Sequence, residues 1–419
     1  MNRREYLASV GVAIGALSGC LSSGKTRSTT QRTQSISKHS ATETITTEQR
    51  TPSPTEATES PTETTANSQE KTTVSQETTV TAGWPQRGYD NRRSRYNRKS
   101  RVPDEPTEAW KLSFEGDTYT TIVSNRALIV QEPNHIGAFD MDEGERLWRK
   151  EVPGTRTNDS LVAKDGIVYY VGRSEKSHFD QSQAGSLVAV DARSGQQQWS
   201  LSGPDMGKGY GAVEYAGDLF LDGEKLQRVD PDSKKIVWEV QAPNGGSFKD
   251  CLVANDIVYT RDYEQNEFMA FEAASGTEIK RWGVDRIRIW MHMKYWDETM
   301  YSGQHSISQG EYVEQAFWPL ECFTPSKALG PNFGSDGVRL FDEEGETIWT
   351  ISPEESVFSG VIADKNILIT AGNSVRCHQM ENGEEVWSRQ SDAGMLDCIV
   401  AEDSVLAFTD DSEEIICYR

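Results

Sequence analysis

One sequence phrase recurs six times between residues 136 and 387 and restricts the possible folds more than any other feature. Each copy has an alternating apolar segment, a turn that is usually acidic and contains glycine, and then a tryptophan. The first copy runs from Ile136 through Asp140 and Gly144 to Trp148. Alternating segments that end in turns predict short antiparallel strands. The six tryptophans are Trp148, Trp199, Trp238, Trp282, Trp349 and Trp387.

A second phrase alternates with the first and consists of a polar turn followed by a β-branched or aromatic run. Seven such hairpins begin at Asn125, Asp165, Asp218, Asp256, Asp297, Lys365 and Asp403. Repeats of roughly 40 residues with four strands each are typical of a β-propeller. Trp110 resembles the end of a repeat and residues 415–418 its beginning, so the two termini complete a seventh unit. We therefore predict an all-β fold, a seven-bladed β-propeller of four-stranded antiparallel blades closed by pairing of the N- and C-terminal strands.

The recurring tryptophan has a structural role in such a ring, because its indole can pack on the neighbouring blade while its N–H finds a carbonyl. The repeat resembles that of the pyrroloquinoline-quinone-like (PQQ-like) propellers, the quinoprotein dehydrogenase-like superfamily. Residues 84–91, from Trp84 to Asn91, resemble the segment that precedes their first blade. The resemblance covers residues 84–419 and implies the fold. It does not imply one function, because the superfamily includes enzymes and assembly-factor lipoproteins.

The first twenty residues predict where the protein is found. Arg3 and Arg4 precede a short apolar run, and residues 17–20 read Leu-Ser-Gly-Cys. This resembles a twin-arginine export signal with a lipobox, which implies cleavage before Cys20 and a lipid on its thiol. An uncleaved membrane anchor is the alternative, but the run is far below the roughly 20 residues that span a bilayer. We expect residues 1–20 to be the signal peptide of a lipid-anchored protein on the extracytoplasmic face of the cell membrane.

Residues 21–82 form a separate segment, with 19 Thr and 10 Ser and almost no large apolar side chains. Such a composition cannot bury enough surface to offset its ordering entropy, so we predict a disordered tether. Hydroxyl groups beside proline resemble an O-glycosylated stalk, and an unmodified linker remains the alternative. Residues 83–419 then form the propeller domain.

Residues 1–82 contain 8 acidic and 8 basic residues, so the net charge of −22 belongs to residues 83–419. This sign argues against nucleic acid as a partner, because like charges repel. An exported lipoprotein with an acidic surface resembles secreted proteins of extremely halophilic archaea. An ordinary acidic extracellular domain is the alternative.

Several common catalytic patterns are missing from the sequence. It has no adjacent cysteines, no Cys-x-x-Cys, no His-Glu-x-x-His and no Gly-x-Ser-x-Gly. The calcium ligands of quinoprotein dehydrogenases cannot be assigned to positions in this chain. Repeat aspartates such as Asp140 and Asp191 lie in turns, where Asp is favoured for local backbone bonding. We therefore predict no catalytic, cofactor-binding or metal-binding residues.

Five cysteines remain once Cys20 carries a lipid, and their positions in the repeat do not favour disulfides. Cys251 matches Cys398 three blades away, and Cys377 matches Cys417 in an adjacent blade, where bonding needs an unusually close approach. We predict that these four and Cys322 are small buried hydrophobic residues.

Two insertions depart from the repeat, residues 172–186 in blade two and residues 303–337 in blade five. Both join second and third strands, so both emerge on one face, where long loops carry function. We predict a binding face there, and the alternative is that the apolar residues only pack the insertions onto the scaffold. Its candidate residues are His178, Tyr312, Phe317 and Trp318.

These observations favour a non-enzymatic binding or assembly scaffold whose partners are proteins or surface glycans, with the membrane reached through Cys20. The alternative is a quinone-dependent dehydrogenase, which would need pyrroloquinoline quinone and Ca²⁺. Asn158 begins an Asn-Asp-Ser sequon and is a possible N-glycosylation site.

Overall fold

The structure is a computed structural model, and all its described residues fall within one compact unit, Ser75–Arg419. The export signal, Cys20 and the tether lie outside the described residues. The described residues are 83–116, 118–132, 134–152, 161–172, 186–202, 211–262, 264–284, 293–302, 305–308, 311–314, 320–331, 337–352, 356–409 and 413–419.

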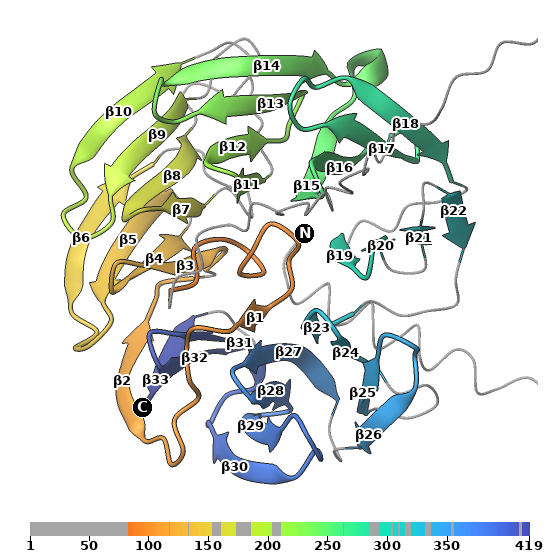
Figure 1. Ribbon diagram of the computed structural model, residues 1–419. Helices are drawn as coiled ribbons and strands as arrows, with labels where there is room; N and C mark the ends of the chain where they lie inside the picture. Colours follow the sequence, from red (N-terminus) through yellow and green to blue (C-terminus); the bar gives the residue numbers. More distant parts are fainter. Residues whose placement is uncertain are drawn as a thin grey trace, which may run out of the picture. The chain divides into compact units, whose positions relative to one another are not determined.

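Eight antiparallel four-stranded sheets, which we call blades 1 to 8, contain nearly all the strands of these residues (Figure 1). Blade 1 holds β3 (Thr121–Ser124), β4 (Ala127–Glu132), β5 (His135–Asp140) and β6 (Arg146–Glu151). Blade 2 holds β7 (Val162–Lys164), β8 (Ile167–Gly172), β9 (Ser186–Asp191) and β10 (Gln197–Ser202). Blade 3 holds β11 (Ala212–Tyr215), β12 (Asp218–Leu221), β13 (Lys225–Asp230) and β14 (Lys235–Gln241). Blade 4 follows the short 3₁₀ helix η3 (Pro243–Gly245) and holds β15 (Phe248–Ala254), β16 (Ile257–Asp262), β17 (Glu267–Glu272) and β18 (Glu278–Gly283).

The second half of the chain builds the other four blades. Blade 5 holds β19 (Lys294–Trp296), β20 (Thr299–Ser302), β21 (His305–Ser308) and β22 (Glu311–Glu314). Blade 6 holds β23 (Cys322–Phe323), β24 (Lys327–Pro331), β25 (Val338–Asp342) and β26 (Thr347–Ile351). Blade 7 holds β27 (Val357–Ala363), β28 (Asn366–Ala371), β29 (Ser374–Gln379) and β30 (Glu385–Gln390), and β1 (Tyr96–Asn97) pairs in parallel with β27. Blade 8 holds β31 (Met395–Ala401), β32 (Ser404–Thr409), β33 (Glu414–Tyr418) and the N-terminal β2 (Glu108–Ser113).

The blades follow one another in chain order around a centre, with the first strand of each innermost (Figure 1). Successive inner strands contact each other from β3 to β19 and from β23 to β31. Blade 8 contains strands from both ends of the described chain, because β2 pairs with β33 and Trp110 lies opposite Cys417. The all-β propeller architecture and this pairing agree with the sequence analysis.

The predicted number of seven blades is wrong, because the described residues form eight sheets. The predicted blade-five insertion at residues 303–337 contributes β21 and β22 to blade 5, and β23 and β24 to blade 6. The hairpin that the sequence analysis did not predict consists of β23 and β24. Its turn is shaped by Thr324, whose Oγ1 accepts hydrogen bonds from the amides of Ser326 and Lys327. This turn has no acidic or Asn residue at its start, and the short outer strand β22 of blade 5 carries no tryptophan, so both features of the repeat are missing here.

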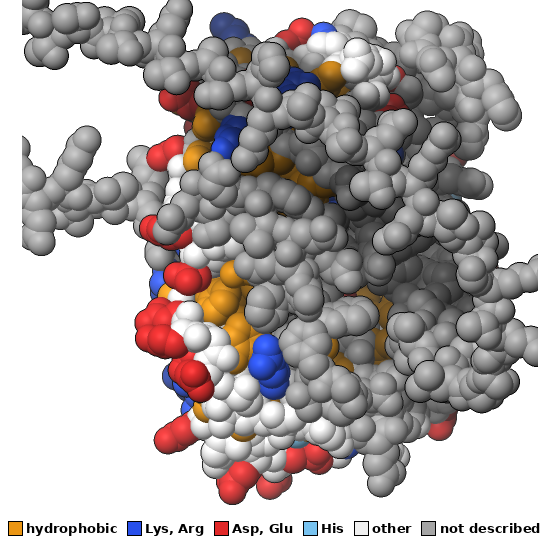
Figure 2. Space-filling model, turned by 90° about the vertical axis from the view of Figure 1, so that its right-hand side faces the viewer, with side chains coloured by type: hydrophobic (Ala, Val, Ile, Leu, Met, Phe, Trp, Pro, Cys, Tyr) orange, Lys and Arg blue, Asp and Glu red, His pale blue; other side chains and the backbone are white. Residues whose placement is uncertain are grey.

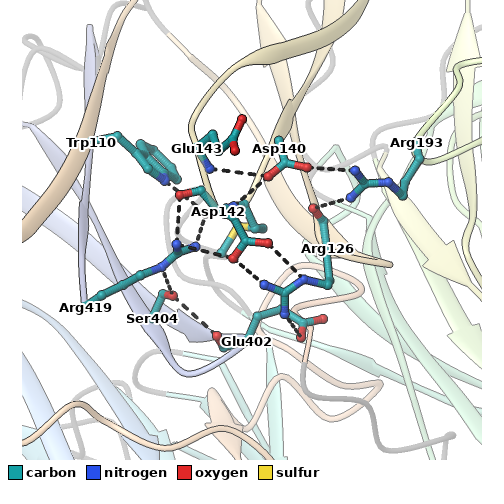
Figure 3. Close-up of polar contacts among 10 residues, drawn as sticks. Trp110, Arg126, Asp140, Asp142, Glu143, Arg193, Glu402, Ser404 and Arg419 are labelled. Atoms are coloured by element: carbon teal, nitrogen blue, oxygen red, sulfur yellow. Dashed lines mark hydrogen bonds and ion pairs between the residues drawn. The ribbon is translucent and has the colours of Figure 1, made fainter.

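The repeated glycine and tryptophan join neighbouring blades. The indole N–H of Trp110 in blade 8 donates to the carbonyl of Met141 in blade 1 at 2.9 Å (Figure 3). The Trp110 ring lies against Gly144. A Cβ on Gly144 would lie 2.9 Å from ring carbons of Trp110. The predicted role of the tryptophan is therefore confirmed. The same contact joins Trp148 to Ala192 and Gly195, Trp238 to Ala273 and Gly276, and Trp349 to Met380 and Gly383.

The repeat aspartate shapes this turn. Asp140 Oδ1 accepts hydrogen bonds from the amides of Asp142 and Glu143, and its other oxygen accepts one from Arg193 of blade 2 at 2.7 Å (Figure 3). The Arg193 hydrogen bond holds the pKa of Asp140 below its usual value. Turn aspartates are thus structural groups, as their positions in the sequence predicted.

All five described cysteines are free thiols and fully buried, which confirms their prediction as small hydrophobic residues. Burial raises the pKa of Cys322 and of Cys377 to about 12, so neither thiol ionises at neutral pH.

The outer surface of the described residues carries many charged side chains. Figure 2 shows carboxylate side chains standing out along its described part, in keeping with the net charge of −22.

No helix in the described part of the chain has the length and hydropathy that crossing a bilayer requires.

Two glycines allow the contribution of the tryptophan contact to be measured. Gly195 and Gly345 both have positive φ, at +66° and +82°, so alanine strains either backbone. A Cβ on Gly195 would lie 2.7 Å from Trp148, whereas no atom lies within 4 Å of a Cβ on Gly345. We expect Gly345→Ala to destabilise by about 1 kcal/mol. Gly195→Ala should cost a further 1–3 kcal/mol or so through overpacking. Denaturant unfolding of both variants measures the difference, and equal losses would contradict this account of the junction.

Candidate functional site

Residues 83–101, which we call the strap, run from blade to blade along the inner strands (Figure 1). The inner strand of each blade is an edge strand. The N–H and C=O groups on its free side, away from the second strand, therefore need partners. The strap supplies such partners in all eight blades. The contacts are Trp84 with Val123, Pro85 with Ala163, Gln86 with Glu214, Asn91 with Val253, Arg92 with Tyr295, Ser94 with Phe323, Arg95 with Ile362 and Asn97 with Val400.

Local interactions hold the strap in shape. Trp84 is buried and packs against Tyr89 with ring centroids 5.3 Å apart. Asp90 Oδ1 accepts hydrogen bonds from the amides of Arg92 and Ser94, and Asp90 Oδ2 accepts one from the Ser94 hydroxyl. Asp is favoured for such turns because its short side chain reaches the following amides. The turn leads directly into Arg93 and Arg95, which pair with the buried side chain of Asp250 and the partly exposed side chain of Asp397.

Arg95 joins the strap to blades 7 and 8. Its guanidinium binds Asp397 with two hydrogen bonds of 2.5 and 3.3 Å and also donates to the Ser359 hydroxyl and the carbonyls of Gly360 and Cys398. Desolvation would raise the pKa of Asp397, but the charge and hydrogen bonds of Arg95 outweigh it and hold that pKa below its usual value. Asp397 is therefore an ionised partner of Arg95 at neutral pH.

Arg93 makes the second junction, in blade 4. Its guanidinium pairs with Asp250 Oδ1 and donates to the Cys251 carbonyl at 3.0 Å. Asp250 Oδ2 receives Arg261 at 2.9 Å and the amide of Met293 in the segment leading to blade 5, also at 2.9 Å. The side chains of Arg93, Asp250 and Arg261 are 5%, 7% and 1% exposed. This is a buried triad of two cations and one carboxylate, and such triads depend on every partner being present.

Lys294, at the start of the inner strand of blade 5, is the third cation near this centre. Its ammonium donates to the carbonyls of Leu320 and Glu321. Desolvation lowers the pKa of Lys294 to about 8, and desolvation raises the pKa of Glu321. The lysine is thus held by backbone carbonyls in an environment that disfavours its charge.

A cleft of about 360 Å³ lies beside the first strap residues, which places it at the low end of small-ligand pockets. Gly83, Lys164, Glu214 and Glu402 are among its lining residues. Lys164 donates to the carbonyl of Gly217, whose amide donates to Glu214, and burial raises the pKa of Glu214. These two charged groups are engaged with the backbone of one turn.

The quinone of the dehydrogenases provides a test of fit, because it carries carboxylates that need cationic partners. Three cations at the centre are already engaged: Arg95 by Asp397, Arg93 by Asp250 and Lys294 by two carbonyls. In the described part of the chain, no group of three or more His, Cys, Asp or Glu side chains has the arrangement of a metal site. A quinone carboxylate at the centre would therefore have to compete with Asp397, Asp250 and the two carbonyls for these three cations.

Most predicted site residues lie outside the described part of the chain. These are the lipidation site Cys20, the export residues Arg3 and Arg4, the sequon residue Asn158, and His178, Phe317 and Trp318. Tyr312 lies in β22, the outer strand of blade 5. The predicted binding face therefore stays a prediction.

Sequence reasoning missed the strap and its partners. Arg93 and Asp250 are 157 positions apart, and no local spacing connects them. The only signal was the resemblance at residues 84–91, which fixed the start of the domain without indicating what it contacts.

A family described as outer membrane protein assembly factor BamB matches residues 102–222, 183–288 and 334–418, well over half of the chain. The 1-butanol dehydrogenase (cytochrome c) of Thauera butanivorans is 31% identical over 176 residues, which are 39% of this chain and 23% of that enzyme. The chain thus spans less than a quarter of that relative's length.

Two solved structures share the fold at low identity. BamB from Moraxella catarrhalis has a TM-score of 0.50 and 13% identity, covering 75% of this chain and 98% of that protein. A europium-containing methanol dehydrogenase has a TM-score of 0.55 and 10% identity, covering 80% of this chain and 98% of that enzyme. The extent of the family match shows that the chain belongs to the repeat family described as outer membrane protein assembly factor BamB.

Proposed function

We propose that this protein is a scaffold that binds and assembles other proteins outside the cell membrane. The observation that carries the proposal is the strap. Its arginines use the carboxylates Asp250 and Asp397 to hold blades together, so the centre of the ring serves the fold itself. Membership of a family described as an assembly factor supports the same conclusion. Surface glycans are the other partner class that an exposed, acidic propeller could meet.

We further propose that the scaffold is anchored by a lipid on Cys20 after export directed by Arg3 and Arg4. The pattern of residues 17–20 supports this. Replacing Cys20 with Ser should release the protein from the membrane fraction into the medium. Replacing both arginines with Lys should keep it inside the cell. A Cys20→Ser protein that stays on the membrane would contradict the anchor.

The proposed binding face comprises His178, Tyr312, Phe317 and Trp318. His178 lies in the connection from β8 to β9, and Phe317 and Trp318 lie in the connection from β22 to β23. Second and fourth strands finish at the same end of their antiparallel sheets, so both connections leave from that end. Aromatic residues are enriched at protein interfaces, which supports their choice.

Site-specific photo-crosslinking in cells tests the proposal. A photoreactive phenylalanine analogue at positions 178 and 318 should give discrete protein adducts. The same analogue at Asp232 and Glu343, exposed in turns at the other end of the sheets, serves as the matched control. Adducts at 178 and 318 but not at the controls support the binding face. Equal labelling at all four positions, or no protein adduct at any, would contradict it.

A quinone-dependent dehydrogenase is the second candidate, and the 31% identity to a butanol dehydrogenase favours it. It would need pyrroloquinoline quinone with Ca²⁺. The engagement of Arg93, Arg95 and Lys294 by the chain itself weighs against it.

A further inference from the structure

We propose that the chain binds one Ca²⁺ between blades 3 and 4, through Asp262, Glu264 and the main-chain carbonyl of Pro243. Asp262 ends β16, Glu264 lies two residues later, and Pro243 begins η3 in the connection from β14 to β15. The site lies outside the repeat phrase and is separate from the strap.

Asp262 is a fully buried aspartate with one oxygen atom unsatisfied. Its Oδ1 accepts hydrogen bonds from the amides of Glu264 at 2.8 Å and Gln265 at 3.2 Å. Its Oδ2 is buried and has no hydrogen-bond partner. A buried carboxylate oxygen without a donor is strongly disfavoured, because desolvation of its charge is not compensated. A cation at this oxygen would remove that penalty.

Gly246 leaves open the space into which this oxygen points. A Cβ built on Gly246 would lie 2.6 Å from Asp262 Oδ2 and 3.2 Å from both Glu264 Oε2 and the Pro243 carbonyl oxygen. The φ of Gly246 is −71°, a value that residues with side chains also adopt. This torsion therefore does not explain why the residue is glycine. Three oxygen atoms from two connections therefore surround one small space that has no side chain of its own.

The donor set determines the class of ligand. Two carboxylates and a carbonyl are hard oxygen donors with a combined charge of −2, and Ca²⁺ prefers such mixed carboxylate and carbonyl sets. Pro243 O accepts one hydrogen bond, from the Gly246 amide, and keeps its second lone pair. Among the described residues, no Lys or Arg forms an ion pair with Asp262 or Glu264, while nearby Arg261 pairs with Asp250. Because Glu264 is exposed, water has access to complete the coordination.

The test is Ca²⁺ binding by the purified full chain after chelator treatment, measured by calorimetry at fixed ionic strength. We expect one saturable site, and Asp262→Asn and Glu264→Gln should each weaken it about tenfold or more. Gly246→Ala should do the same by filling the space. Asp230→Asn is the matched control, because Asp230 accepts hydrogen bonds from the equivalent two turn amides in blade 3 but has no buried oxygen atom without a partner. It should bind Ca²⁺ as the unmodified chain does.

Circular dichroism of each variant checks that it folds, and the exposed position of Glu264 makes Glu264→Gln decisive if Asp262→Asn unfolds. The proposal is overturned if the unmodified chain shows no saturable Ca²⁺ binding, or if folded Glu264→Gln and Gly246→Ala bind Ca²⁺ unchanged. Equal weakening in Asp230→Asn would also overturn it, since that result would indicate a general charge effect.

Discussion

Replacing Asp250 with Ala is expected to destabilise the protein by about 3–5 kcal/mol, as breaking buried ion pairs does. The substitution leaves Arg93 and Arg261 buried without their shared carboxylate. It also leaves the amide of Met293 without its acceptor. A loss of this size is a large fraction of the total stability of a typical protein. Denaturant unfolding followed by tryptophan fluorescence measures it.

Three further variants identify the cause. Asp250→Asn keeps the shape and the tolerance of positive φ, here +64°, but removes the charge, so it isolates the electrostatic part. Arg93→Met leaves Arg261 as a partner for Asp250 and should cost less than Asp250→Ala. Asp232→Asn, an exposed turn carboxylate, should change stability by less than about 0.5 kcal/mol. If Asp250→Ala proved no more harmful than Asp232→Asn, the buried triad would not stabilise the junction.

Deleting the strap, residues 83–101, should prevent formation of a stable propeller. The deletion removes hydrogen bonds to the inner strand of all eight blades and takes away Arg93 and Arg95, the strap partners of Asp250 and Asp397. We expect loss of the cooperative unfolding transition and exposure of apolar surface, detected by calorimetry and dye binding.

A deletion of equal length inside the tether, residues 40–58, is the matched control and should leave the unfolding transition unchanged. Adding a synthetic peptide of residues 83–101 to the shortened chain should restore part of the transition, because the strap contacts are between separate segments. A strap-deleted chain that unfolds with the original midpoint would show that the strap is dispensable for stability.

The sequence predicted the parts of the fold that depend on local chemistry. The turn aspartate, the glycine and the tryptophan act within one short phrase, and the junction of Trp110 with Met141 and Gly144 is the predicted packing with the predicted carbonyl bond. The pairing of β2 with β33 was also predictable, because both half-repeats are recognisable.

The blade number was not predictable in the same way. Blade 5 has no outer-strand tryptophan, and Thr324 replaces the usual acidic residue in the first turn of blade 6. The two irregular units therefore read as one unit with an insertion. Blades 5 and 6 are joined instead by an inner-strand tryptophan, because Trp296 donates its indole N–H to the Thr324 carbonyl.

The strap site depends on contacts between distant segments, and single-sequence patterns carry no information about them. Arg95 and Asp397 are 302 positions apart. Each looks like an ordinary surface charge when its neighbours are unknown, and only the ring brings them together.

The most direct test of the central claim is reconstitution of the purified full chain with pyrroloquinoline quinone and Ca²⁺ in concentrated salt. Free cofactor is removed by gel filtration, and bound quinone absorbance and alcohol- or sugar-dependent dye reduction are then measured. Because Arg93, Arg95 and Lys294 are engaged by the chain itself, we predict no stoichiometric quinone and no dye reduction above the protein-free control. Retention of one quinone per chain with substrate-dependent turnover would contradict the scaffold function and establish a dehydrogenase.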